Sequence, residues 1–348
     1  MADYNLGCTV RLDTFRSLAA SQAPDSKTRS VFSSSCHSGS RTLLAGLYEK
    51  GAIRHIQVQA VPLPPPLFRE RLDRVAAAGI PSIVHAPHHG HGVNPCAPAA
   101  YDDRPAKEIE AYIDLAMSQT LEAADALGAE TIVLHAGRYE PGGRRAAVET
   151  FAGFLDRHAD PRLALENLPA VYAGYSLLGN TAGELAALAG KKITRFCLDF
   201  PHLACTASYR RLSFAEELER FEGLDVTLHH LSNIRRGSIT DEHLELDHPD
   251  GGLDLAAVFA RLRRHPAVPT TLEYKQDSAE VYARQAEVFA GLWEDRAGAR
   301  IASLPHRGRP EDNRHQQNGP IAAVVIPLDQ GKQNPICGGN PNELCNDP

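Results

Sequence analysis

Short apolar runs alternate along this chain with longer amphipathic segments. The runs are four to seven residues long, and the longer segments place their apolar residues at helical spacing. This alternation is typical of repeated strand-helix units, in which parallel strands form the core and helices cover it. Eight runs are predicted to be strands: Tyr4–Val10, Ala52–Val58, Ser82–His85, Thr131–His135, Leu163–Glu166, Arg195–Asp199, Val226–His230 and Thr270–Glu273. The predicted helices between them include Ala106–Leu127, Ala182–Leu188 and Ser278–Trp293.

The number and spacing of these units predict the fold. Eight units over about 300 residues match the length of a (β/α)₈ TIM barrel. We therefore predict an α/β chain with one barrel over residues 1–298. Residues 299–348 hold seven Pro and five Gly without a helical period, which predicts a flexible C-terminal extension outside the barrel.

Composition narrows the class of protein. The 348 residues are 43% hydrophobic, enough for a large core, and the net charge is −7. No basic field indicates a polyanionic partner, although bound metal ions can reverse the charge of a site locally. The start of the chain lacks a signal peptide and no apolar run reaches about 18 residues, so we expect a soluble, cytoplasmic protein with no membrane partner. The seven cysteines are scattered without a CxxC pair, which argues against a disulfide framework or a zinc finger.

Candidate chemistry gathers at the ends of the predicted strands. Six runs end in, or directly at, a residue that can bind a metal: His85, His135, Glu166, Asp199, His230 and Glu273. The C-terminal ends of parallel barrel strands face one shared mouth, so these side chains are expected to converge there. A single such residue is usually an ordinary loop residue, but six in one register are not explained that way.

Three more candidates stand beside these six, namely His202, Asp241 and His243. Imidazole and carboxylate groups together suit Zn²⁺, Mn²⁺ or Fe²⁺. The sequence therefore predicts a divalent metal site at the barrel mouth.

Two neighbouring features have less definite roles. Cys197 precedes Asp199 by two residues and so shares its side of the strand, but we expect it to pack in the adjoining helix core. His88, His89 and His91 follow His85 in a glycine-containing loop. They can be substrate contacts, additional metal ligands or a plain polar loop.

In the order of these motifs the sequence resembles the endonuclease IV family of the xylose isomerase-like TIM barrel superfamily. The motifs are HAPHH, LHAG, LENLP, LDFPH, HHLSN, DEH and LEYK, beginning at residues 85, 134, 165, 198, 229, 241 and 272. All nine ligand positions of that family's trinuclear zinc site have a matching residue. The resemblance extends over residues 4–298.

The resemblance implies up to three divalent metal ions, zinc foremost, with iron or manganese as alternatives. Glu166 would bridge two of them, and the first would be completed by His85 and His135. The second would be completed by Asp199, His230 and Glu273, and the third would be held by His202, Asp241 and His243. The implied catalytic residues are Glu166, Glu273 and His202. Metals so close together lower the pKa of a bridging water and neutralise charge on a phosphodiester, so the implied activity is hydrolysis of a small-molecule or nucleic-acid phosphodiester.

One departure from the family affects the expected substrate. The family has an aromatic and apolar stretch after its first ligand histidine, whereas here His85 is followed by Ala-Pro-His-His-Gly-His-Gly. Without such a wedge, opening a DNA duplex is not supported. We therefore expect a smaller or single-stranded phosphodiester.

Two other activities remain open on the same fold. A sugar isomerase or epimerase would need one metal at Glu166, Asp199, His230 and Glu273, and would leave the other candidates without a role as ligands. A multinuclear non-haem iron enzyme would oxidise a cysteine-containing peptide. The C-terminal extension contains two cysteines, Cys337 and Cys345, in a turn-rich setting that such a peptide substrate could resemble.

Overall fold

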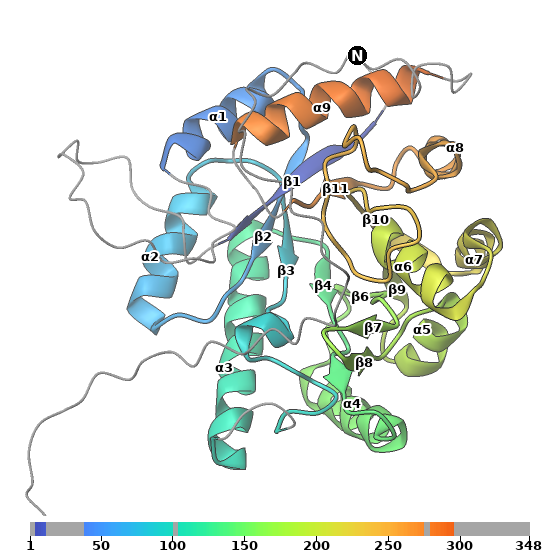
Figure 1. The fold of residues 1–348 in the computed structure, drawn as a ribbon. Coiled ribbons are helices and arrows are strands. Elements are labelled where there is room, and N and C mark those ends of the chain that lie inside the picture. Colours follow the sequence, from blue (N-terminus) through green and yellow to red (C-terminus); the bar gives the residue numbers. More distant parts are fainter. Residues whose placement is uncertain (1–3, 12–37, 100–103, 275–278, 296–348) are drawn as a thin grey trace, which may run out of the picture. The chain divides into compact units, whose positions relative to one another are not determined.

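Eight parallel strands form a closed barrel in this protein. The computed structural model describes residues 4–11, 38–99, 104–274 and 279–295. The strands follow one another around the barrel in chain order, and the last pairs with the first to close it (Figure 1). They are β1 (Leu6–Arg11), β2 (His55–Gln59), β3 (Ser82–His85), β4 (Ile132–Leu134), β6 (Leu163–Glu166), β9 (Arg195–Asp199), β10 (Asp225–Leu231) and β11 (Thr270–Leu272). The predicted (β/α)₈ barrel is therefore confirmed.

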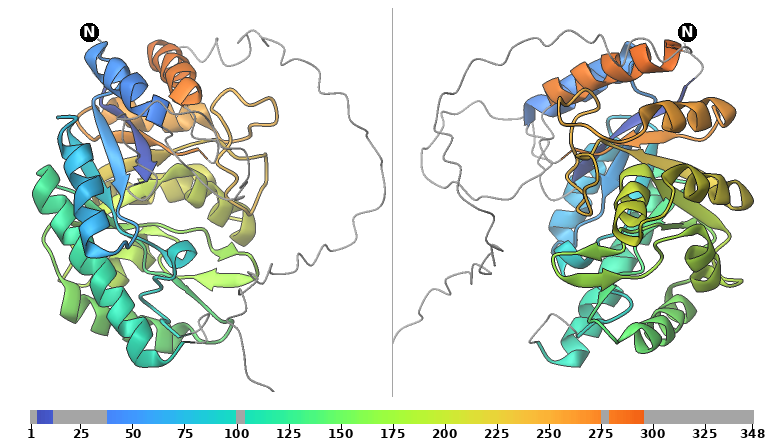
Figure 2. Two further views of the ribbon diagram at one scale, coloured as in Figure 1. Left: turned by 90° about the vertical axis from the view of Figure 1, so that its left-hand side faces the viewer. Right: turned by 45° about the vertical axis from the view of Figure 1, so that its right-hand side comes forward.

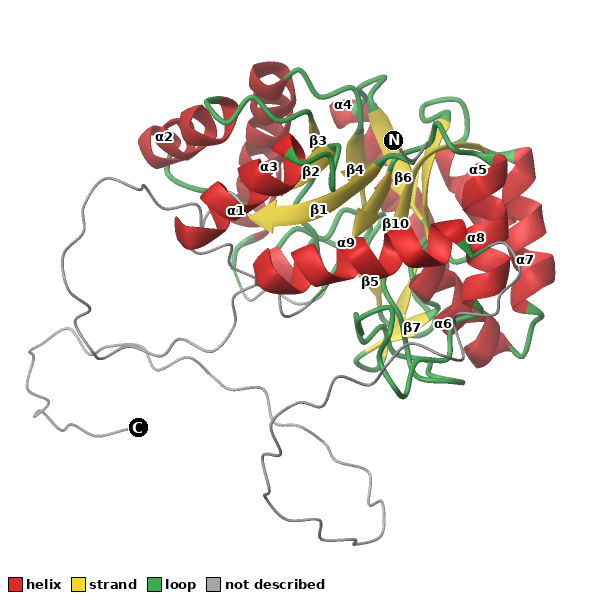
Figure 3. Ribbon diagram, turned by 90° about the horizontal axis from the view of Figure 1, so that it is seen from above, coloured by secondary structure: helices red, strands yellow, loops and turns green. Residues whose placement is uncertain are grey.

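Helices surround the strands on the outside of the barrel (Figure 3). They are α1 (Ser38–Glu49), α2 (Pro65–Ala76), α3 (Ala106–Leu127), α4 (Arg144–His158), α5 (Ala182–Ala189), α6 (Phe200–Arg210), α7 (Phe214–Arg220), α8 (Leu255–Arg264) and α9 (Ala279–Glu294). Short 3₁₀ turns lie at His89–His91 (η2) and Phe221–Gly223 (η3). The apolar faces of these helices and the outer faces of the strands make up the main core. None of the helices that the structure describes is both long and apolar enough to cross a bilayer.

A second, smaller apolar cluster fills the inside of the barrel. It consists of Ile83, Val133, Ala164, Cys197 and Leu228, one from each of five neighbouring strands. The expectation that Cys197 packs in the helix core is wrong, because the alternation of a strand turns Cys197 to the same inner side as Asp199. The cluster forms an apolar floor below the barrel mouth.

A buried histidine lies where the barrel closes. His55 on β2 contacts the Asn5 side chain through Nδ1 and the Thr271 hydroxyl through Nε2, both at 3.0 Å. Its ring lies against Gly7 so closely that a Cβ there would be 2.2 Å from His55 Nε2. Gly7 in β1 therefore leaves the space that the His55 ring occupies between β1, β2 and β11.

Three short antiparallel strands form a separate sheet that the hydrophobic pattern did not predict. They are β5 (Arg138–Tyr139), β7 (Val171–Tyr172) and β8 (Tyr175–Leu177), paired in the order β5-β8-β7. They belong to the loops after β4 and β6. Figure 2 shows this sheet on the same side of the barrel as the long loop between β10 and α8. The C-terminal extension predicted over 299–348, with Cys337 and Cys345, lies outside the described residues.

Candidate metal centre

The nine candidate ligands come from eight different segments at one end of the barrel. Six of them end a strand or lie within one residue of its end. The other three come from the first turn of α6 and the loop after β10. Contacts of 4.0 Å or less join all nine into one continuous network: His85, His135, Glu166, Asp199, His202, His230, Asp241, His243 and Glu273.

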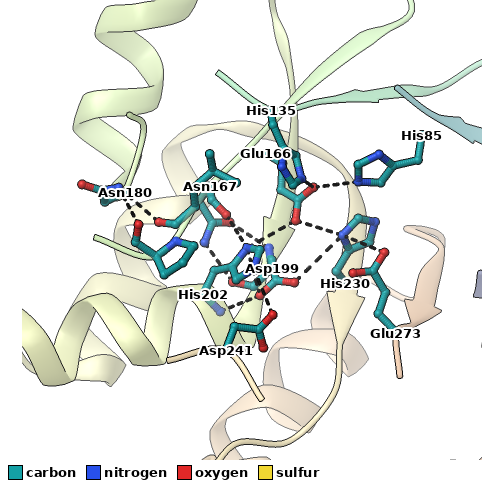
Figure 4. A network of polar contacts seen from close by, with 12 residues as sticks. His85, His135, Glu166, Asn167, Asn180, Asp199, His202, His230, Asp241 and Glu273 are labelled. Carbon is teal, nitrogen blue, oxygen red and sulfur yellow. Dashed lines mark hydrogen bonds and ion pairs between the residues drawn. The ribbon is translucent and has the colours of Figure 1, made fainter. Parts of the chain in front are cut away.

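Glu166 lies at the centre of this network, and its two carboxylate oxygens face different histidines (Figure 4). Oε2 is 2.8 Å from His135 Nε2 and 3.5 Å from His85 Nε2. Oε1 is 3.1 Å from His230 Nδ1 and 3.4 Å from His202 Nδ1. One buried carboxylate thus lies between two separate groups of nitrogen donors.

On the Oε1 side, two further carboxylates approach His230. The Nδ1 atom of His230 is 3.5 Å from Glu273 Oε1 and 4.0 Å from Asp199 Oδ2. Asp199 ends β9 and also caps α6, since its Oδ1 accepts a hydrogen bond of 2.5 Å from the backbone N–H of His202. Capping fixes both the carboxylate and the first turn of the helix that carries His202.

Asp241 joins two histidines on the third side of the network. Its Oδ2 is 2.5 Å from His243 Nε2 and 3.4 Å from His202 Nε2. His243 has φ of +50°, in the left-handed region that residues other than glycine rarely adopt. The loop after β10 therefore holds the backbone of His243 in a strained conformation.

Four of the five network histidines have a hydrogen-bond acceptor for one ring nitrogen. In His85, His230 and His243 this nitrogen faces away from the carboxylates, whereas the Nδ1 atom of His202 also lies 3.4 Å from Glu166 Oε1. The Nδ1 atoms of His85, His202 and His243 donate to the backbone oxygens of Ala86, Asn167 and Glu273, at 2.6, 2.9 and 3.2 Å. Nε2 of His230 donates to the Gln57 side-chain oxygen at 2.7 Å. Such partners fix the tautomer, so the other nitrogen presents its lone pair to the centre.

Sequence reasoning missed two residues that support the site. Gln57 on β2 contacts His230 and also donates to Glu273 Oε1 at 2.7 Å. Asn167 accepts from the Asp199 backbone N–H at 2.7 Å and donates to its carbonyl at 2.9 Å. The sequence carries a signal for Asn167, because this residue directly follows the candidate ligand Glu166. It carries none for Gln57, because a single glutamine in a predicted strand does not indicate a contact with a ligand.

The buried charges of the network perturb one another. Burial alone would raise the pKa of Glu166, but His230 and His135 hold it well below the usual value. Burial, together with the Glu166 and Asp241 carboxylates, raises the pKa of Asp199 to about 7 against the opposing effect of His202. Several acidic groups packed out of water need positive charge beside them.

The donor set fits divalent cations. Ligand atoms lie within 4.8 Å of one another in the trio His85, His135 and Glu166, in Glu166, Asp199 and His202, and in Asp199, His230 and Glu273. Cys197 forms a further such group with Glu166 and His230, and burial raises its pKa to about 12. Nitrogen and carboxylate oxygen donors, without thiolate, suit zinc, manganese or iron.

A cavity of about 550 Å³ opens above the network. Its wall includes Tyr172, Tyr274 and Tyr282, and none of the described residues that line it is Lys or Arg. His88, His89 and His91 also line it. Burial lowers the pKa of His88, and of His89 to about 3, so both are neutral near pH 7.

Solved structures with the same barrel differ in the activities that their descriptions give. A D-tagatose 3-epimerase-like protein superposes with a TM-score of 0.58 at 16% identity, over 85% of this chain and 99% of that one. Endonuclease IV from Thermus thermophilus gives 0.53 at 21% identity, over 84% and 99%. An L-ribulose 3-epimerase gives 0.53 at 16% identity, over 86% and 99%. Identities this low establish the fold alone.

The sequence itself assigns the family. No curated protein matches the chain. The family described as xylose isomerase-like TIM barrel matches residues 51–292, which include seven of the eight barrel strands in full, from β2 to β11. The chain therefore belongs to the xylose isomerase-like TIM barrel family.

Proposed function

We propose that this protein is a metal-dependent hydrolase that cleaves a phosphodiester and holds up to three divalent cations, zinc foremost, in the nine-residue network. The position of Glu166 carries the proposal. Its Oε2 faces His85 and His135, and its Oε1 faces His202 and His230. A carboxylate shared between two groups of donors suits a site for several metals better than a site for one.

The chain would divide the ligands as follows. His85, His135 and Glu166 would hold one cation, and Glu166, Asp199, His230 and Glu273 a second. His202, Asp241 and His243 would hold the third. When bound, the cations supply Lewis acidity and neutralise charge on the phosphodiester oxygens.

The protein's own contribution is rigidity and shielding. The acceptors on Ala86, Asn167, Gln57 and Glu273 keep four imidazoles in one orientation, so little reorganisation is needed when charge develops. Since no Lys or Arg is among the described residues of the cavity wall, positive charge for an anionic substrate comes mainly from the cations. This favours a substrate of low charge density, a small ester or a single strand, over a duplex.

The cavity supports a small or single-stranded substrate. The 3₁₀ turn after β3 presents histidines and glycine where the endonuclease family has its apolar wedge. Opening a duplex costs a few kcal/mol, which inserted side chains normally offset. We therefore expect poor cleavage of abasic duplex DNA.

A single-metal epimerase is the second candidate, favoured by the barrels of the two epimerase-type structures. It would use Glu166, Asp199, His230 and Glu273. It gives no role to His135, whose Nε2 is 2.8 Å from Glu166, or to the Asp241–His243 pair.

The test combines metal content with turnover. Protein purified without added metal is analysed for bound elements and incubated with bis(p-nitrophenyl) phosphate, single-stranded DNA and abasic duplex. We expect more than one zinc per chain and hydrolysis of the small ester or the single strand. The double variant Asp241→Ala, His243→Ala should lower the rate on the order of 100-fold or more.

The same loop offers a matched control. His248→Ala, Asp250→Ala removes the same residue types from a turn outside the cavity, and turnover should stay at the wild-type level. One exchangeable manganese with interconversion of ketoses, and no ester hydrolysis, would replace the proposal with the epimerase. Bound iron with oxygen consumption would replace it with the oxidative enzyme.

A further inference from the structure

His135 differs from the other four histidines of the network at its outer ring nitrogen. Its Nδ1 is buried and has no hydrogen-bond partner among the residues that the structure describes. The whole side chain is only 10% exposed, so water has little access to it. A histidine that binds a metal through Nε2 carries its proton on Nδ1 and normally donates it to an acceptor. In the described part of the chain, that acceptor is missing for His135.

Two histidines of the loop after β3 lie beside His135. The ring centroids of His88 and His135 are 5.1 Å apart, and one ring nitrogen from each of His88, His89 and His135 lies within 4.8 Å of the others. The Nδ1 of His89 is also buried and without a partner in the described part of the chain. A hydrogen bond from His135 Nδ1–H to His89 Nδ1 would satisfy both atoms, and a neutral His89 would then carry its proton on Nε2.

The backbone fixes the tautomer of His88 in the same sense. Its Nδ1 accepts a hydrogen bond of 3.1 Å from the backbone N–H of Gly90. A neutral imidazole that accepts through Nδ1 carries its proton on Nε2. No described residue accepts from His88 Nε2, and His88 lines the cavity.

A fourth metal ion does not suit these three rings. A cation would need a lone pair from each ring, but Gly90 engages that of His88, and His135 would have to bind metals through both nitrogens.

We propose that His88 and His89 form a substrate subsite, in which their Nε2–H groups donate to a phosphoryl oxygen beside the cation position of His85, His135 and Glu166. This subsite rests on the proposed phosphodiester chemistry. It supplies neutral donors in a cavity wall whose described residues include no Lys or Arg. His88 and His89 thereby take the role of Lys or Arg side chains for an oxygen that the cations do not hold.

The test measures binding of inorganic phosphate to the metal-loaded full chain by titration calorimetry. The variant His88→Asn keeps an acceptor for the Gly90 N–H, because an asparagine oxygen closes the same kind of turn, and deletes the Nε2–H donor. His248→Asn is the matched control, since His248 Nδ1 accepts from the backbone N–H two residues ahead at the same 3.1 Å but lies outside the cavity.

We expect phosphate affinity to fall on the order of 10-fold to 100-fold in His88→Asn, with metal content and Tm unchanged, and to stay constant in His248→Asn. His89→Asn should lower phosphate affinity in the same range. Equal affinity of wild type and His88→Asn, or no measurable phosphate binding by the wild type, would overturn the subsite.

Loss of a metal equivalent in His88→Asn would also overturn it, and would make His88 a ligand. Phosphate binding that depends on His88, in a protein that hydrolyses no phosphodiester, would support the subsite while contradicting the proposed function. Hydrolysis of a phosphodiester, with phosphate binding that does not depend on His88, would support the proposed function and contradict the subsite.

Discussion

Replacing Glu166 with Gln should remove more metal than replacing any other ligand of the network. Glu166 is the only described residue whose carboxylate faces a histidine pair through each oxygen, with four contacts between 2.8 and 3.5 Å. The substitution keeps the size and shape of the side chain and removes one negative charge. Any loss of binding therefore reports charge rather than packing.

The magnitude follows from the geometry. A unit charge and a divalent cation 4 Å apart attract each other by about 8 kcal/mol at an effective dielectric constant of about 20. The amide oxygen of Gln remains a ligand, so only part of this is lost. If a third is lost, affinity falls on the order of 100-fold for each of the two cations beside Glu166.

Glu273→Gln provides the comparison, because the Glu273 carboxylate meets a single network histidine, His230, at 3.5 Å. Both variants and the wild type are dialysed against a zinc buffer of fixed free concentration and analysed for bound metal. We expect Glu166→Gln to lose more than one equivalent and Glu273→Gln to lose no more than one. Full occupancy with normal turnover in Glu166→Gln would refute the bridging position.

Three further predictions concern stability. Burial lowers the pKa of His55 from 6.5 to about 3, so the fold keeps the imidazole neutral and its stability falls as the pH drops from 6.5 toward 3. The loss should be about 2 kcal/mol between pH 6.5 and 4.5, and urea unfolding of His55→Gln should be less pH-dependent than that of the wild type. Gly7→Ala should cost about 1–3 kcal/mol or more in the same assay because its Cβ would meet the His55 ring, and an unchanged midpoint would refute this contact. A chain ending near Gly298 should stay soluble with an unchanged Tm, and a large drop in Tm would show that the extension is part of the fold.

The convergence of the candidate ligands could be predicted from the sequence because two rules coincide at them. Apolar runs define strands, and parallel strands bring their C-terminal ends together, so a polar residue such as Glu166 at the end of β6 is placed without any knowledge of contacts. The predicted bounds of β3, β6, β9 and α3 agree with the structure for the same reason. Periodicity is strongest where both ends of an element are marked by turn residues.

The residues that support the ligands could not be found in this way. Gln57 is a polar residue within an apolar strand, and only the three-dimensional neighbourhood shows that it contacts His230 and Glu273. The small sheet of β5, β7 and β8 was missed because strands of two or three residues carry no readable alternation. The expected placement of Cys197 in the helix core was wrong because side preference in a strand follows alternation rather than apolarity.

The double position of Asp199 makes helix α6 a reporter of the metal centre. One carboxylate oxygen of Asp199 caps the helix through the His202 N–H, and the other faces His230. A cation drawn to this carboxylate would hold it in place and suppress fraying of the first turn. Amide hydrogen exchange at His202 should therefore slow on metal loading, while exchange at the start of α5, which Thr181 caps away from the network, stays the same. Amide hydrogen exchange at the N-terminus of α6 can thus report whether the metal site is occupied.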